Sequence, residues 1–467
     1  MKYISTRGRI EPVSFNQAVM MGLASDGGLL LPESIPTFSR KEIDELAKLD
    51  YSELAFAIFT RFIGDDIPAA DLRRLIETSY AAFSTSLVAP LKEVDGLYIQ
   101  ELFHGPTLAF KDVALQFLGN LFEYLLQREK RSLNIIGATS GDTGSAAIHG
   151  IRGKDNINIF ILHPHGKVSP VQEKQMTSVL DDNVFNLAID GNFDDGQRVV
   201  KEIFADLEFK QKFNLGAVNS INWARIMAQI VYYFSAYAQL PAAARKDLSV
   251  VVPTGNFGNI FAGWMAKKMG LPIKRLILAT NANDILSRFI NTGIYATAKA
   301  QPTLSPSMDI QLASNFERYL YFLNDYDSLK LEEMMAVFGD SGSLEIDANL
   351  LKRVQTDFAA DRVDDQATLT TINNIWQKSG YILDPHTATG VCAAERLRQH
   401  DKTAGTIVCL ATAHPAKFPD AVAKAIGRPP TAPPAIAALE NLPCRSDLIK
   451  ADTDAVKDYI REKLNTN

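Results

Sequence analysis

The chain has 467 residues, a formal net charge of −6 and 46% hydrophobic residues. This length accommodates about two or three domains with large apolar cores. The net charge is negative, and the sequence shows no basic cluster of the kind that binds nucleic acid. No apolar run is long enough to cross a membrane, and the N-terminus has no apolar signal segment. We therefore expect a soluble cytoplasmic protein without a nucleic-acid or membrane partner.

Cysteine and histidine usage gives no sign of a disulfide framework or a metal centre. Cys392, Cys409 and Cys444 are far apart and form no C-x-x-C pair, which favours reduced thiols. The seven histidines show no H-x-x-x-H spacing, so we expect no metal site.

The first 90 residues are predicted to form a separate unit. They show helical spacing and turns but no regular alternation of strands and helices, with an apolar strand closed by prolines at 29–36. Helices are expected at 39–49, 51–63 and 69–83. Residues 91–100 predict a hairpin.

From about residue 130, short apolar strands alternate with helices. The strands are expected at 133–137, 158–162, 184–189, 215–218, 248–252, 275–280 and 406–410. This alternation predicts a parallel sheet with right-handed crossovers. We expect residues 281–330 to be loop-rich surface and 329–381 to be mainly helical. The segment from 428 begins with a proline-rich spacer and ends in a charged helix.

Polar clusters follow five of the predicted strands. They are Thr139–Gly144, His163–Lys167, Asn219–Arg225, Thr254–Asn259 and Thr412–Lys417. In open α/β sheets, ligands bind outside the carboxyl ends of the strands. The five clusters therefore predict one ligand site.

Lys111 ends the stretch ELFHGPTLAFKD and begins a run with helical spacing. The helix dipole disfavours a cation in the first turn. A neutral amine, or one bonded to a carbonyl cofactor, would remove the conflict. The alternative is a lysine whose amine reaches water.

Two helix starts are suited to anions. The loop Gly255–Asn259 places two glycines between a strand and a helix, where backbone N–H groups can cradle a phosphate. It matches neither common nucleotide-binding glycine pattern. The start at Thr139–Gly144 suits a carboxylate. The alternatives are a plain turn and a plain N-cap.

Three further side chains could contact a ligand. Lys167 and Arg225 could together bind a phosphate ester, or each could be a solvated surface cation. Thr412 could form a hydrogen bond with a ring nitrogen, or bond its own backbone.

Several motifs in one order resemble a known family. ELFHGPTLAFKD, TSGDTG, GKVSPVQEKQM, NSINWAR, PTGNFGN and TAHPAKF closely resemble threonine synthase. That family belongs to the pyridoxal 5'-phosphate (PLP) superfamily of the tryptophan synthase β subunit and the serine/threonine dehydratases. YISTRG and SDGGLLLPESIP resemble the opening domain of its longer bacterial and fungal members.

The resemblance implies a fold and a domain plan. The fold is α/β, with two open twisted, mostly parallel sheets and flanking helices (PLP fold type II), plus an N-terminal extension domain. Residues 1–90 would be the threonine-synthase-type N-terminal domain, and 428–467 a C-terminal tail. Residues 91–427 would be the catalytic core of two α/β subdomains, with the active site between them.

The resemblance also implies residue roles. Lys111 would be the catalytic Schiff-base lysine, and Thr412 would pair with the pyridine nitrogen. The cofactor phosphate would be held by Gly255, Asn256, Phe257, Gly258 and Asn259. The substrate would be bound by Thr139, Ser140, Gly141, Asp142, Thr143, Lys167, Asn219, Ser220, Asn222 and Arg225. Asp142 would also approach the cofactor, because it stands where the superfamily commonly has an Asn near the ring hydroxyl.

The implied activity is that of a lyase in threonine biosynthesis. It would convert O-phospho-L-homoserine and water to L-threonine and phosphate. Two alternatives remain open at this stage: another PLP-dependent lyase, such as a serine/threonine dehydratase or phospholyase, and a non-catalytic PLP-binding protein. The oligomeric state is not predicted.

Overall fold

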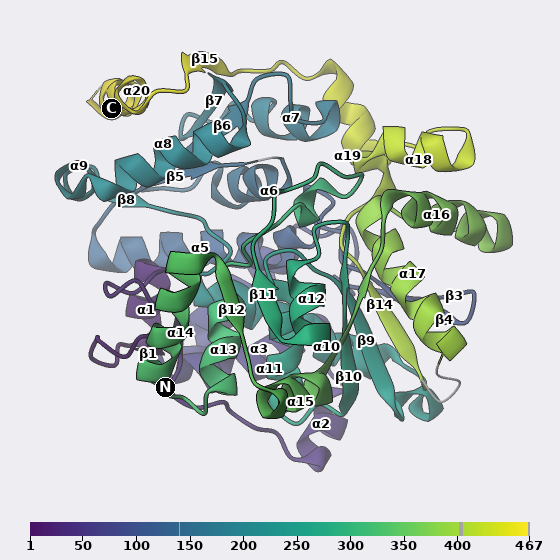
Figure 1. Ribbon diagram of the computed structural model, residues 1–467. Coiled ribbons are helices and arrows are strands. Elements are labelled where there is room, and N and C mark those ends of the chain that lie inside the picture. The colour runs from purple at the N-terminus through teal and green to yellow at the C-terminus, as the bar shows by residue number, and fades with distance from the viewer. Residues whose placement is uncertain (140, 401–404, 466–467) are drawn as a thin grey trace. The chain divides into compact units, whose positions relative to one another are not determined.

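The computed structural model describes residues 1–139, 141–400 and 405–465 (Figure 1). The chain divides into two compact units. Unit 1 comprises Met1–Glu77, Phe83–His104 and Ser220–Pro430, and unit 2 comprises Thr78–Ala82, Gly105–Asn219 and Thr431–Asn467. Each unit contains one large sheet, and the strands within these two sheets are mostly parallel. The expected fold class is confirmed.

Unit 2 is built on a parallel five-stranded sheet with the order β15-β7-β6-β5-β8. Its strands are β5 (Leu133–Ala138), β6 (Ile157–Pro164), β7 (Val184–Asp190), β8 (Leu215–Gly216) and β15 (Asp447–Lys450). The helices of this part of the chain are α5 (Lys111–Glu129), α6 (Asp142–Ile151), α7 (Pro170–Thr177), α8 (Phe193–Ala205), α9 (Leu207–Lys212), α19 (Pro434–Ala437), η5 (Ala438–Asn441) and α20 (Thr453–Asn465). The central strands are apolar because both faces of the sheet are covered.

The C-terminal segment does more than the sequence indicated. Besides the predicted charged helix, it supplies the edge strand β15, which pairs in parallel with β7. Val456 and Ile460 of α20 are fully buried in the same cluster as Phe160 and Leu187. The strand DLIK is short and half charged, so its own pattern gave no strand signal. The segment becomes a strand only because it pairs with β7, which lies some 260 residues earlier in the chain.

Helices α5 and α6 cross at unusually short range. A Cβ atom on Gly119 of α5 would lie 1.9 Å from the Gly150 carbonyl oxygen of α6, and a Cβ on Gly150 would lie 2.5 Å from the Leu115 carbonyl oxygen. Only hydrogen side chains permit this approach. The contact lies about two turns from the first residue of each helix. These first residues are Lys111 and Asp142.

Unit 1 contains a six-stranded sheet with the order β13-β10-β9-β14-β4-β3. The strands are β3 (Leu91–Val94), β4 (Leu97–Glu101), β9 (Leu248–Pro253), β10 (Ile273–Thr280), β13 (Phe358–Arg362) and β14 (Ile407–Ala411). β3 and β4 form the predicted hairpin, and the other pairings are parallel.

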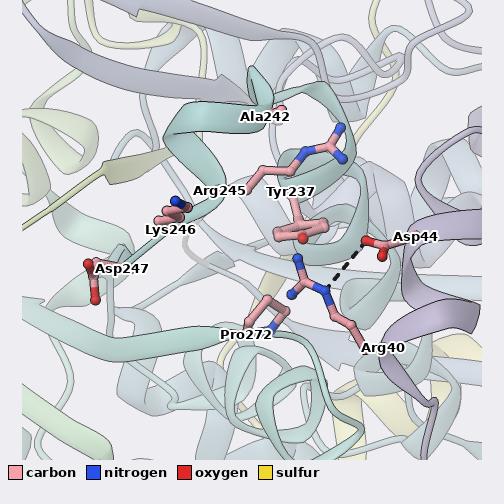
Figure 2. A pocket seen from close by; sticks show the side chains of 8 residues that line it. All are labelled: Arg40, Asp44, Tyr237, Ala242, Arg245, Lys246, Asp247 and Pro272. Carbon is pink, nitrogen blue, oxygen red and sulfur yellow. Dashed lines mark ion pairs between the residues drawn. The ribbon is translucent and has the colours of Figure 1, made fainter.

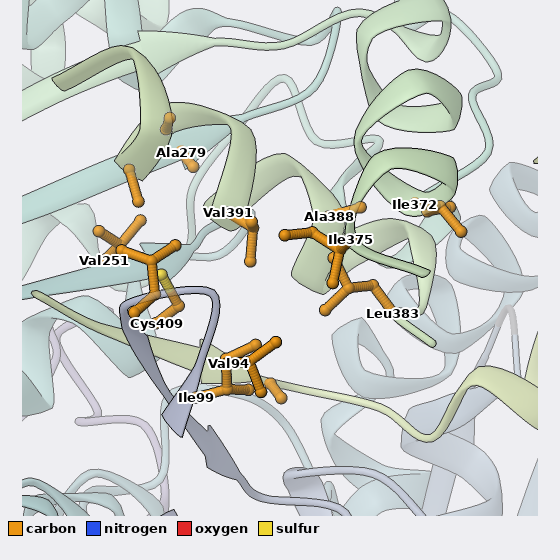
Figure 3. Close-up of a cluster of buried hydrophobic side chains, with 14 of the residues drawn as sticks. Val94, Ile99, Val251, Ala279, Ile372, Ile375, Leu383, Ala388, Val391 and Cys409 are labelled. Carbon is orange, nitrogen blue, oxygen red and sulfur yellow. The ribbon is translucent and has the colours of Figure 1, made fainter. Parts of the chain in front are cut away.

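One face of this sheet packs on C-terminal helices. Figure 3 shows Val251 and Cys409 of the sheet facing Ile375, Ala388 and Val391 of the helices. The helices on this side are α16 (Asp365–Ser379), α17 (Pro385–His400) and α18 (Pro419–Ile426). This packing fixes the ends of β9 and β14, where two of the polar clusters begin.

The other helices and strands lie in the N-terminal segment and between residues 220 and 360. They are β1 (Tyr3–Ser5), β2 (Leu30–Pro32), β11 (Ile294–Ala296), β12 (Ser343–Glu345), α1 (Phe15–Met21), α2 (Arg40–Leu46), α3 (Tyr51–Ile63), α4 (Ala69–Tyr80), α10 (Trp223–Gln239), α11 (Gly258–Lys268), α12 (Ile285–Thr292), α13 (Phe316–Leu323), α14 (Ser328–Ser341) and α15 (Ala348–Asp357). Short 3-10 turns are η1 (Gly64–Asp66), η2 (Ala242–Arg245), η3 (Pro306–Met308) and η4 (Pro415–Lys417).

The prediction that 329–381 is mainly helical is confirmed by α14, α15 and α16. The stretch also contains two strands that were not predicted, β12 and β13, whose partners β11 and β10 lie elsewhere in the chain. Most of the first 90 residues belong to the same compact unit as residues 220–430. The domain plan 1–90, 91–427 and 428–467 therefore stays a prediction. None of the helices in residues 1–139, 141–400 and 405–465 has the length and apolar character needed to cross a membrane.

The α5–α6 crossing generates a stability prediction. Gly119→Ala should lower the free energy of unfolding by about 1–3 kcal/mol, because the methyl group forces two backbones apart. Urea denaturation measures this change. The matched control is Gly339→Ala in α14, where a Cβ meets no atom within 4 Å. It should instead raise stability, by about 0.5–1 kcal/mol. Equal effects of the two substitutions would contradict the close crossing.

Candidate functional site

Lys111 is the first residue of α5, as predicted, and its side chain is almost buried. It is 9% exposed. Its Nζ lies 3.5 Å from Asp142 Oδ2 and 5.2 Å from the centre of the Phe110 ring. A buried amine at a helix N-terminus needs a compensating negative charge. In unit 2, Asp142 supplies it.

Asp142 is held by a side chain that the sequence did not single out. Gln172 Nε2 donates a 2.8 Å hydrogen bond to Asp142 Oδ1, which leaves Oδ2 directed at Lys111. Gly141, just before α6, has φ of 138°, a conformation that only glycine adopts easily. A Cβ at Gly141 would lie 2.5 Å from the Gln172 side chain. Glycine therefore allows Gln172 to reach the carboxylate.

The rest of the 139–144 turn is held by Thr139. Its Oγ1 accepts hydrogen bonds from the N–H groups of Gly141 and Gly144 at 3.0 and 2.9 Å. Thr139 is thus committed to the turn itself. Thr143 is partly exposed, and Ser140, predicted to bind the substrate, lies outside the described residues.

Lys167 lies elsewhere on unit 2. Its side chain is exposed, and its Nζ donates a 3.0 Å hydrogen bond to the Gly191 carbonyl oxygen after β7. Asn219 is the last residue of the segment Gly105–Asn219 of this unit and is partly exposed.

In unit 1, the loop Gly255–Asn259 connects β9 to α11. Phe257 adopts a left-handed conformation, with φ of 63°. Its buried ring packs edge-on against Phe316 at 5.2 Å between ring centres. Within the part of the chain that the structure describes, none of the five backbone N–H groups of this loop donates a hydrogen bond. Unbonded N–H groups at a helix start are the donors that an anionic group accepts from.

The end of this loop is held to α10. Asn259 Oδ1 accepts hydrogen bonds from the Tyr232 and Tyr233 hydroxyls at 2.6 and 2.9 Å. The Asn259 carbonyl oxygen accepts another from Tyr233 at 2.8 Å. Its buried Nδ2 has no hydrogen-bond partner among the described residues. The first turn of α11 is therefore rigid, yet it retains an unused donor.

Thr412 follows β14 in the same unit. Its N–H donates to Thr387 Oγ1 at 3.3 Å, and Thr387 in turn donates to Asp384. Thr412 is 6% exposed, and its hydroxyl forms no hydrogen bond with any described residue. Taken by itself, unit 1 suits a group with an anion and a ring acceptor, because the loop N–H groups and the Thr412 hydroxyl have no hydrogen-bond partner among the described residues. Unit 2, taken by itself, offers a buried amine, which suits a carbonyl.

The predicted residues at the start of α10 have different environments. Arg225 is 4% exposed, and burial lowers the pKa of its guanidinium to about 10, so it remains a cation at neutral pH. Asn222 caps α10 by accepting from the Ala224 N–H at 3.1 Å, and it donates to the Val19 carbonyl oxygen at 2.8 Å. The Ser220 and Ser314 hydroxyls lie 2.6 Å apart.

Another pocket, shown in Figure 2, is unrelated to these residues. Its volume is about 520 Å³, and it is lined by Arg40, Asp44, Tyr237, Ala242, Arg245, Lys246, Asp247 and Pro272. Arg40 is paired with Asp44 at 3.5 Å. Arg245 already donates to the Ala238 and Leu240 carbonyl oxygens. None of the predicted site residues lines it.

Comparison with known proteins first defines the class. Residues 83–339 match the family model "Pyridoxal-phosphate dependent enzyme", so the chain is a PLP-dependent enzyme with PLP as its cofactor. Residues 2–80 match "Threonine synthase N terminus" and 387–460 match "Threonine synthase, C-terminal". The chain belongs to the threonine synthase family.

Individual relatives cover the whole chain. The threonine synthase of Pseudomonas aeruginosa is 47% identical, over 100% of this chain and 99% of its own length. A solved structure of PLP-bound threonine synthase from Brucella melitensis is 47% identical with a TM-score of 0.95, and covers 99% of both chains. The solved yeast threonine synthase is 46% identical with a TM-score of 0.95, and covers 100% of this chain and 99% of its own.

Several residues of the site were not indicated by the sequence. Gln172, Asn315 and Arg318 are buried, and each bonds a residue far away in the sequence: Asp142, Asn256 and Leu30, respectively. His163 is the last residue but one of β6 and is fully buried, and neither ring nitrogen has a partner among the described residues. Burial lowers the pKa of its imidazole to about 4. The HPHGK cluster drew attention to this turn, but not to the buried state of its first histidine.

His163 generates a prediction on stability and pH. Between about pH 6.5 and 4, the unfolded chain binds a proton at this position and the folded chain does not, so stability falls as the pH falls. From pH 7 to 5 the loss from this group should be about 2 kcal/mol. His163→Gln should remove that part of the loss in urea titrations at the two pH values. His165→Gln, at an exposed histidine two residues away, should leave the pH dependence nearly as it is. An unchanged pH dependence in His163→Gln would show that His163 binds its proton equally well in the folded and the unfolded chain.

Proposed function

We propose that this enzyme converts O-phospho-L-homoserine and water to L-threonine and phosphate, and that it does so in the cytoplasm. One observation carries the reaction: the chain matches threonine synthases over its whole length. The buried lysine, Lys111, opposite Asp142 supports it. The free thiols of Cys392, Cys409 and Cys444 support the location, because cytoplasmic thiols are kept reduced.

We propose that three groups of the chain bind the cofactor: Lys111, the loop Gly255–Asn259 and Thr412. Lys111 would hold its aldehyde carbon through Nζ, the N–H groups of Gly255–Asn259 its phosphate, and Thr412 its ring nitrogen. The unbonded donors of the loop and the unbonded Thr412 hydroxyl support this assignment. When bound, PLP supplies an electron sink for negative charge that develops on the substrate carbons.

The amine of Lys111 would then move protons on the substrate. As a free amine, Nζ would accept the proton from Cα and serve Cβ and Cγ from the same position. Asp142 at 3.5 Å would stabilise the ammonium form after each proton is accepted. Gln172 would keep the carboxylate turned toward the amine. The Cγ–O bond breaks with loss of phosphate, and the hydroxyl of water adds at Cβ.

The two charged ends of the substrate would be bound by different groups. The start of α6 would bind the carboxylate through the N–H groups of Asp142 and Thr143, and Gly141, whose N–H donates to Thr139 Oγ1, would shape the turn. The phosphate would be bound by Arg225, with Lys167, Asn219 and Ser220 contributing; charge would build up on it as it leaves. Thr139 and Asn222 would contribute by holding the two turns, since their side chains are bonded there.

The first prediction of this assignment concerns Lys111. Lys111→Ala should lower threonine formation by at least about 10³-fold, and it should abolish the visible absorbance that borohydride bleaches in the wild type. Lys201→Ala, at an exposed lysine on α8, is the control and should retain both. Threonine and phosphate are assayed together, because phosphate accompanied by a keto acid would indicate a phospholyase instead. Full turnover by Lys111→Ala would refute the assignment.

A second prediction concerns Arg225. Loss of a charge-assisted contact to phosphate typically costs about 1.5–3 kcal/mol. Arg225→Gln should therefore raise the KM for the phosphorylated substrate by about 10-fold to 100-fold. Lys167→Gln should have a smaller effect because its amine is exposed and bonded to a carbonyl. Thermal unfolding of both variants separates a folding defect from a binding defect. An unchanged KM in a folded Arg225→Gln enzyme would assign Arg225 to the core alone.

A further inference from the structure

Two buried polar residues lie behind the loop Gly255–Asn259 in unit 1. Asn315 and Arg318 are both 0% exposed and stand at the start of α13. They belong to the stretch 281–330, which the sequence predicted to be loop-rich surface. A fully buried guanidinium is rare and has a large desolvation cost. The contacts of Arg318 and Asn315 show which part of the structure this buried charge holds in place.

Asn315 holds one carbonyl group of the loop. Its backbone N–H and its Nδ2 both donate to the Asn256 carbonyl oxygen, at 3.1 and 3.2 Å. Nδ2 also donates to the Ser220 carbonyl oxygen at 3.1 Å. In addition, the Ser314 hydroxyl donates to Asn256 Oδ1 at 3.2 Å. Both the main chain and the side chain of Asn256 are therefore fixed from the same side.

Fixing this carbonyl also fixes a donor. The peptide bond between Asn256 and Phe257 is planar and trans, so the Phe257 N–H points opposite to the Asn256 carbonyl. With the carbonyl oxygen bonded to Asn315, the N–H is directed to the other side of the loop. A rotation of this peptide plane would replace a donor by a carbonyl oxygen, which repels an anion.

Arg318 in turn fixes the amide of Asn315. Its Nη1 donates to Asn315 Oδ1 at 2.6 Å. An oxygen facing Arg318 leaves Nδ2 facing the two carbonyl oxygens, so the amide has one favourable orientation. The guanidinium also donates to the Leu30 carbonyl oxygen of β2, at 2.8 and 3.1 Å, and to that of Ile221. All these acceptors are neutral, so none of the hydrogen bonds of Arg318 neutralises its positive charge.

We propose that Asn315 and Arg318 are positioning residues for the cofactor phosphate: they hold the Asn256–Phe257 peptide so that its N–H faces the anion. Through the same guanidinium, the loop is tied to the N-terminal strand β2 and to the 220–222 segment. This inference rests on the proposed function of the loop. Burial lowers the pKa of Arg318 to about 9, which leaves the side chain charged at neutral pH.

The test compares two ligands that differ only in the phosphate. Full-length enzyme is freed of cofactor, and dissociation constants for PLP and for pyridoxal are measured by absorbance titration. In Asn315→Ala and Arg318→Lys, the constant for PLP should rise by about 10-fold to 100-fold, while that for pyridoxal should change by less than about 2-fold. Arg353→Met is the control, at an exposed arginine of α15 that pairs with Asp325 at 2.7 Å; it should change neither constant.

The outcomes separate the possibilities. Equal weakening of PLP and pyridoxal, or no weakening of PLP, would overturn the positioning role. If Arg318→Lys does not fold, Asn315→Ala and the smaller change Asn315→Ser give the same ratio without altering the buried charge. Should the wild-type enzyme itself bind PLP no better than pyridoxal, the phosphate role of the loop would fall, and this inference with it. If the wild-type enzyme binds PLP more tightly than pyridoxal and the variants keep the same two dissociation constants, only this inference is rejected.

Discussion

A buried amine needs a nearby negative charge, and the 3.5 Å pair between Lys111 and Asp142 satisfies this constraint. The pair exists because α5 and α6 cross in direct backbone contact at Gly119 and Gly150. Larger residues would separate the helix starts and leave a cation against the positive end of a helix dipole. The chemistry proposed for Lys111 depends on this packing, since the same carboxylate can stabilise the amine in its protonated form.

The loop proposed to bind the cofactor phosphate does not rely on a charged side chain of its own. The loop Gly255–Asn259 carries no cationic side chain, and its donors without a partner among the described residues include backbone N–H groups and Asn259 Nδ2. The backbone donors are effective only when their peptide planes are held in one orientation, because each plane also carries a carbonyl. Asn315 supplies that restraint, and Arg318 restrains Asn315. Positive charge is thus kept near the loop without occupying the place of the ligand.

Much of this arrangement was visible in the sequence. Apolar runs marked the strands, and the polar clusters fell where the strands end, as for Thr254–Asn259 after β9 and Thr412 after β14. The helical spacing after Lys111 placed that residue at the first position of α5. By contrast, β12, β13 and β15 were missed, since each is a short segment that becomes a strand only by pairing with a distant one. Gln172 and Arg318 gave no signal, because nothing local distinguishes a buried polar side chain from a solvated one.

By itself, the sequence determined the kinds of groups and their place relative to strands and helices: the lysine, the glycine-rich loop, and the order of the motifs that mark the family. These are local properties, governed by periodicity, turn chemistry and helix termini. Only the tertiary structure decided which groups are partners. Asp142 lies opposite Lys111, Asn222 is a helix cap, and Asn315 lies behind Asn256. Partnership depends on burial and on contacts between segments far apart in the chain, which no local pattern encodes.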